Sequence, residues 1–210
     1  LEQLALLHER LGVTSLVDNV GQGPAIIVGV RPSGASRMVA TQRVELSNGK
    51  QRVYRDVGHL RYTNSPPHFH WHLMRFDAFE LRTLDGRTLV TDRKSGFCLA
   101  DHYGLAPGNW NRRPAFFGNC EQGRPHATYV LQGTSLGYTD RYPAHFHGQD
   151  LDLRGVPAGV YDLVHRANLD GRLEELDYTN NAASVRIRID WAGSTPSVTV
   201  LRTCPDAERC

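Results

Sequence analysis

The sequence predicts an all-β protein, built as an antiparallel β-sandwich with long functional loops. Short apolar runs rich in Val, Ile, Tyr and Phe follow one another and are separated by Gly, Pro, Asn and Asp, which is typical of strands joined by turns. In residues 185–191 (VRIRIDW), Val185, Ile187 and Ile189 alternate with polar side chains. This period of two indicates a half-buried strand.

The predicted elements follow in chain order. Residues 1–12 carry leucines near helical spacing and end in Gly12, so we expect a short N-terminal helix or leader over 1–14, followed by one domain over 15–210. No repeat or linker divides that domain. The segments expected to form strands are 25–30, 36–46, 51–62, 68–81, 127–132, 160–167, 183–190 and 197–202.

Length and composition exclude several classes of protein. The 210 residues suit one β-rich domain, and 40% hydrophobic with 22% charged residues is ordinary globular composition, which excludes disorder as the main theme. The net charge of +2 comes without a dense basic block, so no nucleic-acid partner is expected. No apolar run approaches the roughly 20 residues of a membrane helix, so no membrane partner is expected either.

The four cysteines lack CxxC spacing and favour two disulfides over a zinc knuckle. Disulfides favour an oxidising compartment, and we expect a secreted or extracellular protein. Cys98 and Cys120 lie near the ends of a segment (92–122) that is poor in alternation. A disulfide between them would pin a long functional loop.

The strongest local signal is His68-Phe69-His70-Trp71-His72. Positions i, i+2 and i+4 of a strand share one face, and the histidines lie close enough along it to surround one ion, while Phe69 and Trp71 turn to the opposite, buried side. Three imidazoles favour copper or zinc over iron or nickel. They also leave a coordination position open, which favours catalysis over a purely structural site.

Three other interpretations of these histidines remain. The histidines can form a solvated polar strand face. The chain can be a secreted β-sandwich that binds copper or zinc without catalysis. It can also be a mononuclear iron dioxygenase, which requires iron-dependent turnover and forms no quinone.

Four motifs, taken together in this order, resemble the catalytic domain of the lysyl oxidase family, of the bacterial or archaeal type. The resemblance spans roughly residues 15–190. The motifs are HFHWHLM (68–74), DRKSGFCLAD (92–101), GYTDRYPAHFHGQDLDL (137–153) and ELDYTNN (175–181).

The resemblance implies a copper amine oxidase that builds lysine tyrosylquinone from its own side chains. It implies His68, His70 and His72 as copper ligands, Lys94 and Tyr142 as the crosslinked pair, and Asp140 as the catalytic base; it also implies the disulfides Cys98–Cys120 and Cys204–Cys210. The implied substrates are a primary amine, in the family a peptidyl lysine, and molecular oxygen, with release of aldehyde, ammonia and hydrogen peroxide.

Each of these residues also has a simpler reading. Lys94, one of two lysines in the chain, can be a solvated loop cation. Tyr142 can be a buried strand tyrosine with a satisfied hydroxyl, and Asp140 can be a turn or capping residue.

The resemblance further implies a calcium site at Glu175, Asp177, Asn180 and Asn181, whose oxygen atoms suit calcium but are equally common in plain turns. The chain departs from the animal enzymes by Ser15 in place of an acidic calcium ligand, Ser65 in place of an upstream histidine, Gly148 in place of a cysteine, and by His145 and His147 in place of acidic residues. These two histidines can supply a ligand or a base, or can be exposed loop residues.

Overall fold

The computed structural model describes residues 3–66, 68–92, 96–105, 114–144 and 149–210. Lys94, His145, His147 and Gly148 lie outside the described residues. Within the described ranges the chain forms sixteen strands and no helix, which confirms the predicted all-β class.

All the strand pairings described are antiparallel and form three sheets. The strands are β1 (Gln3–Leu7), β2 (Arg10–Asp18), β3 (Ala25–Val30), β4 (Arg37–Glu45), β5 (Gln51–Ser65), β6 (His68–Met74), β7 (Asp77–Arg82), β8 (Thr88–Thr91), β9 (Gly96–Phe97), β10 (Tyr103–Gly104), β11 (Tyr129–Thr134), β12 (Tyr138–Tyr142), β13 (Asp150–Asp152), β14 (Gly159–Ala167), β15 (Ala182–Ala192) and β16 (Thr195–Cys204).

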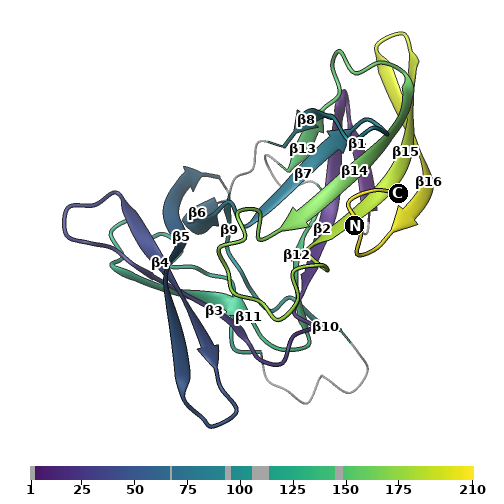
Figure 1. Ribbon diagram of the computed structural model, residues 1–210. Coiled ribbons are helices and arrows are strands. Elements are labelled where there is room, and N and C mark those ends of the chain that lie inside the picture. The colour runs from purple at the N-terminus through teal and green to yellow at the C-terminus, as the bar shows by residue number, and fades with distance from the viewer. Residues whose placement is uncertain (1–2, 67, 93–95, 106–113, 145–148) are drawn as a thin grey trace.

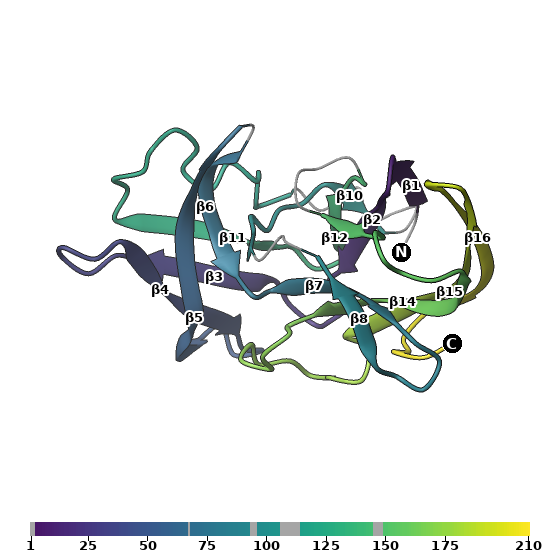
Figure 2. The same cartoon turned by 90° about the horizontal axis from the view of Figure 1, so that it is seen from above.

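The first sheet has the order β11-β3-β4-β5-β6-β9, and the second has the order β16-β15-β14-β7-β8. Both Figure 1 and Figure 2 place these two sheets at opposite ends of the molecule. The third sheet, β1-β2-β12-β10 with β13 paired to β2, includes strands that lie between them.

The expected N-terminal helix is wrong. β1 and β2 pair as a hairpin with Leu7 opposite Arg10, and β2 continues through position 14, where the predicted leader ends. Leu11 and Val13 are fully buried on one face of β2. A helix of about twelve residues is marginal without tertiary packing, whereas β2 gains hydrogen-bonded partners on both sides from β1, β13 and β12.

The predicted strand segments other than 68–81 are confirmed. Val185, Ile187 and Ile189 on β15 are buried, while Arg188 and Asp190 face solvent, as the period of two predicts. The segment predicted as one strand over 68–81 is divided into β6 and β7 at Arg75, which has a left-handed φ of 60°. This turn directs β6 into the first sheet and β7 into the second.

Both expected disulfides are present. Cys98 is bonded to Cys120, and Cys204 is bonded to Cys210. The first bond joins the residue after β9 to the loop that precedes β11. The second closes a short loop at the end of β16.

Candidate functional site

The three histidines lie on β6 and point to one face, as the alternation predicts. β6 pairs with β5 in the register Ser65 to His68, Thr63 to His70 and Arg61 to His72. One ring nitrogen from each histidine lies within 4.8 Å of the corresponding atoms of the other two. This arrangement can hold one metal ion.

The individual contacts fit a metal better than a solvated polar face. Nε2 of His70 lies 2.7 Å from Nε2 of His72, and Nδ1 of His72 lies 3.0 Å from Oγ1 of Thr63. The threonine contact orients the His72 ring so that its other nitrogen faces the cluster, as second-shell partners of metal-bound histidines do. Three converging imidazole nitrogens form a donor set that suits copper or zinc.

Trp71 supports the histidine strand from its opposite face. Its side chain is buried, its backbone N–H donates to the carbonyl of Cys120 over 3.0 Å, and its Nε1 donates to the carbonyl of Arg124 over 3.1 Å. The expected burial of Phe69 is wrong, because this side chain is 37% exposed. Its backbone is paired with β5 opposite Asn64 and its carbonyl accepts a hydrogen bond from the N–H of Gly123 over 2.7 Å, so the strand is held here although the ring is partly open to solvent.

The short strand β9 joins the histidine strand to the second part of the site. Gly96 pairs with Met74, and a Cβ built on Gly96 would lie 2.7 Å from the Cβ of His72. A side chain at position 96 would therefore crowd His72, one of the three candidate metal ligands. The ring of the next residue, Phe97, packs edge-on against the ring of Tyr142 with centroids 4.7 Å apart.

Tyr142 and Asp140 lie on β12 and are both buried. The Tyr142 hydroxyl lies 2.7 Å from Oδ2 of Asp140 and 2.7 Å from the carbonyl oxygen of Cys98, two acceptors between which its single proton is shared. Burial, followed by the neighbouring Asp140 carboxylate, holds the pKa of the Tyr142 phenol well above its usual value of 10. The phenol is therefore protonated at neutral pH and lies against an acceptor for that proton.

Gln149 fixes the backbone beneath this pair. Its Nε2 donates to the carbonyl of Tyr142 over 3.0 Å and to the carbonyl of Val13 over 2.6 Å, and the side chain is buried. Tyr142 itself pairs with Ser15 of β2. The strand that carries the tyrosine and the aspartate is thus held on several sides.

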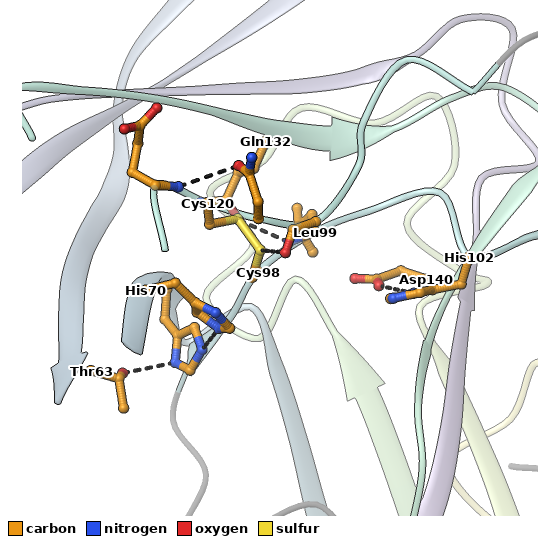
Figure 3. Close-up of a disulfide and its surroundings, with 12 residues drawn as sticks. Thr63, His70, Cys98, Leu99, His102, Cys120, Gln132 and Asp140 are labelled. Carbon is orange, nitrogen blue, oxygen red and sulfur yellow. Dashed lines mark hydrogen bonds and ion pairs between the residues drawn. A yellow bond between two sulfur atoms is a disulfide. The ribbon is translucent and has the colours of Figure 1, made fainter. Parts of the chain in front are cut away.

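Sequence reasoning missed two residues that follow Cys98. Asp101 accepts hydrogen bonds from the backbone N–H groups of Ala115, Phe116 and Ser135 and so fixes the ends of the long loop. Nδ1 of His102 lies 2.9 Å from Oδ1 of Asp140. Figure 3 shows the Cys98–Cys120 disulfide with His70 on one side and Asp140 with His102 on the other. The sequence offers no local signal for this pairing, because His102 and Asp140 are distant along the chain.

The residues expected to bind calcium are only partly brought together. Glu175 Oε1 accepts hydrogen bonds from Nδ2 of Asn181 and Nδ2 of Asn168. The Asp177 carboxylate accepts hydrogen bonds from the backbone N–H and the hydroxyl of Thr179, which is a turn interaction. Asn180 is exposed, and Ser15 is buried opposite Tyr142 rather than placed at this turn. The calcium site stays a prediction, and Oε1 of Glu175 is engaged by two amide donors in this structure.

The model of the lysyl oxidase family matches residues 37–200, which is most of the chain. The chain belongs to the lysyl oxidase family. All four motifs lie inside the matched region, whereas β1, β2 and β3 precede it.

Curated relatives agree with this membership of the lysyl oxidase family. The chain is 28% identical over 141 residues to lysyl oxidase homolog 2A of Danio rerio, a match that covers 64% of the chain and 17% of the relative. It is 31% identical over 124 residues to lysyl oxidase homolog 2 of Xenopus laevis and 29% identical over 124 residues to lysyl oxidase homolog 4 of Homo sapiens. Each of these two matches covers 59% of the chain and 15% of the relative.

The chain therefore corresponds to about one sixth of the length of these relatives. Among the residues that the structure describes, no helix has the length and apolar character needed to cross a membrane.

Proposed function

We propose that this domain is a secreted, copper-dependent amine oxidase that converts primary amines, above all peptidyl lysine, to aldehydes with a quinone made from Lys94 and Tyr142. The observation that carries the proposal is the contact of one short segment with both halves of the site. Gly96 packs against the metal-ligand candidate His72, and the carbonyl of Cys98 accepts a hydrogen bond from the Tyr142 hydroxyl.

Chain connectivity supports Lys94 as the partner of Tyr142. Lys94 precedes Gly96 by two positions, and two residues of extended chain span at most about 7 Å. Family membership and the residue order of the motif agree with this assignment. Lys50, the other lysine, is exposed in the turn between β4 and β5.

His68, His70 and His72 would hold the copper ion. When bound, copper supplies electron transfer to oxygen, and its positive charge favours the phenolate form of a nearby tyrosine. Zinc shares the preference for imidazole but does not change oxidation state, so a zinc-loaded protein should stay unprocessed.

The protein's own groups supply the proton transfers. Oxidation of Tyr142 requires loss of the phenol proton, and burial raises the pKa of that phenol. Oδ2 of Asp140 lies 2.7 Å away as an acceptor for it. During turnover the same carboxylate would take the proton from the substrate carbon that bears the amine, as a general base within hydrogen-bonding reach. Aromatic packing of Phe97 on Tyr142 excludes water from this side of the ring.

Peptide mass mapping after exposure of the apoprotein to copper and air tests the proposal. We expect a covalently joined peptide that contains both Lys94 and Tyr142, together with reactivity toward a carbonyl reagent. Separate, unmodified Lys94 and Tyr142 peptides would contradict the oxidase function and favour a domain that binds metal without catalysis.

The two lysines provide a matched pair of variants. Lys94→Arg should abolish quinone formation and spare copper binding, because arginine stays protonated and cannot add as an amine. Lys50→Arg should leave both unchanged. Loss of copper binding in Lys94→Arg would mean that this residue supports the fold and not the chemistry.

A further inference from the structure

His102 connects a buried carboxylate with solvent. The side chain of Asp140 is fully buried, whereas the side chain of His102 is 41% exposed. Nδ1 of His102 lies 2.9 Å from Oδ1 of Asp140, and Oδ2 of the same carboxylate lies 2.7 Å from the Tyr142 hydroxyl. One oxygen of Asp140 therefore faces the reacting ring, and the other faces an imidazole that reaches the surface.

The backbone holds His102 against the strand that carries Asp140. The His102 N–H donates to the carbonyl of Thr139 over 3.0 Å, and the next residue, Tyr103, pairs with Thr139 in the β10–β12 ladder. Figure 3 shows the imidazole lying beside the Asp140 carboxylate. The contact is thus built into the sheet and does not depend on a free surface side chain.

Nδ1 of His102 has a partner in each of its protonation states. When it carries no proton, it accepts a hydrogen bond from the backbone N–H of Arg141, 3.0 Å away. When it is protonated, it donates to Oδ1 of Asp140. A proton can therefore arrive at this atom and leave it without rearrangement of the surrounding backbone. The Arg141 guanidinium lies over the Tyr103 ring, 5.8 Å from its centroid.

We propose that His102 is the proton relay between Asp140 and solvent. This inference rests on the proposed function, in which Asp140 takes a proton from the amine-bearing carbon of the substrate. The C–H bond breaks, its electron pair reduces the quinone, and the proton goes to the Asp140 carboxylate. The carboxylic acid then passes a proton to Nδ1 of His102 and a proton leaves Nε2 to water; exchange with water restores the Nε2–H tautomer before the next turnover. Molecular oxygen takes the two electrons from the reduced cofactor and becomes hydrogen peroxide, and water releases the substrate nitrogen as ammonia.

The relay is needed because Asp140 itself is closed to solvent. A buried carboxylic acid that keeps its proton cannot act as a base in the next turnover. An imidazole has two ring nitrogens and can accept a proton at one and release a proton from the other, which suits a relay. Its absence should therefore slow repeated turnover more than the first proton abstraction.

His102→Asn tests the relay, with His126→Asn, at an exposed histidine, as the matched control. Asparagine can keep a hydrogen bond to Asp140 but cannot carry a proton onward. We expect kcat to fall by about 10²-fold, the size of a typical acid–base contribution, while quinone content and the rate of anaerobic quinone bleaching by the first amine stay unchanged. His126→Asn should have the same kcat as the wild-type protein.

Added imidazole distinguishes a proton relay from a purely structural role, because it can restore proton transfer but not a lost structural contact. In His102→Gly, kcat should rise in proportion to added imidazole, because the site of the lost ring is open to solvent. An unchanged kcat in His102→Asn would overturn the relay. The relay would also be overturned if the rate of anaerobic quinone bleaching in His102→Asn fell by the same factor as kcat. His102 would then act by positioning Asp140. If the wild-type protein forms no quinone, the result would instead contradict the proposed function.

Discussion

Removal of the Cys98–Cys120 disulfide should lower the stability of the fold and slow quinone formation while copper binding is kept. The bond joins residues 22 positions apart. The chain-entropy relation gives about 3 kcal/mol for closing a loop of this length. For Cys204–Cys210, with a separation of 6, the same relation gives about 2 kcal/mol. The double variants Cys98→Ser/Cys120→Ser and Cys204→Ser/Cys210→Ser therefore form a matched pair.

The two disulfides differ in what they hold. The carbonyl of Cys98 accepts a hydrogen bond from the Tyr142 hydroxyl, and the carbonyl of Cys120 accepts one from the backbone of Trp71. The histidine strand β6 is held by its pairing with β5, which does not involve either disulfide. We therefore expect the first variant to bind copper with normal stoichiometry but to form quinone about 10²-fold more slowly, as misplacement of a reacting group by about 1 Å predicts.

Urea unfolding and the carbonyl-reagent assay measure the two effects. Both double variants should unfold at lower urea concentration, and only the Cys98→Ser/Cys120→Ser protein should form quinone slowly. Equal quinone rates in the two variants would refute the argument that this disulfide places Tyr142. An unchanged unfolding midpoint in the first variant would refute its contribution to stability.

Three further predictions concern buried groups. His165→Leu should lower the free energy of unfolding by about 3 kcal/mol in urea titrations, because it leaves the buried carboxylate of Asp77 without its hydrogen bond from Nε2 of His165. Adding Asp77→Val to this variant should recover most of the lost stability. Gly96→Ala should weaken copper binding about tenfold in chelator competition, whereas Gly23→Ala, where a Cβ meets no atom within 4 Å, should not. The metal-free Tyr142→Phe variant should be less stable than the unmodified protein at pH 9, and the difference should shrink by pH 11. The raised phenol pKa contributes stability that is complete below pH 10 and is lost as pH rises through the folded-state value, so a constant difference in urea midpoints would contradict the assignment.

Features that depend on local sequence could be predicted. The alternation in 68–72 already places three imidazoles on one face, because strand geometry alone fixes the direction of successive side chains. The same reasoning predicts the buried face of β15. Phe69 shows its limit: alternation gives the face of a side chain but does not say whether another element covers it.

Features that depend on long-range pairing could not be predicted from one sequence. The leucines near the N-terminus fit helical spacing, yet β2 is stabilised by pairing with β12, more than a hundred residues later. His102 lies beside Asp140 only because β10 pairs with β12. Neither contact leaves a periodic signal in the segments concerned.

The segment from Gly96 to His102 places the parts of the site relative to one another. Its first residue packs on His72, its second on the Tyr142 ring, and its last on Asp140. Between these contacts the backbone N–H of Leu99 donates to the buried side chain of Gln132 over 2.9 Å, which ties the segment to β11. This one segment of seven residues thus contacts His72, the Tyr142 phenol and Asp140. A small shift of this segment would change all three distances together, and substitutions at Phe97 or Cys98, which contact Tyr142, should impair quinone formation before they impair copper binding.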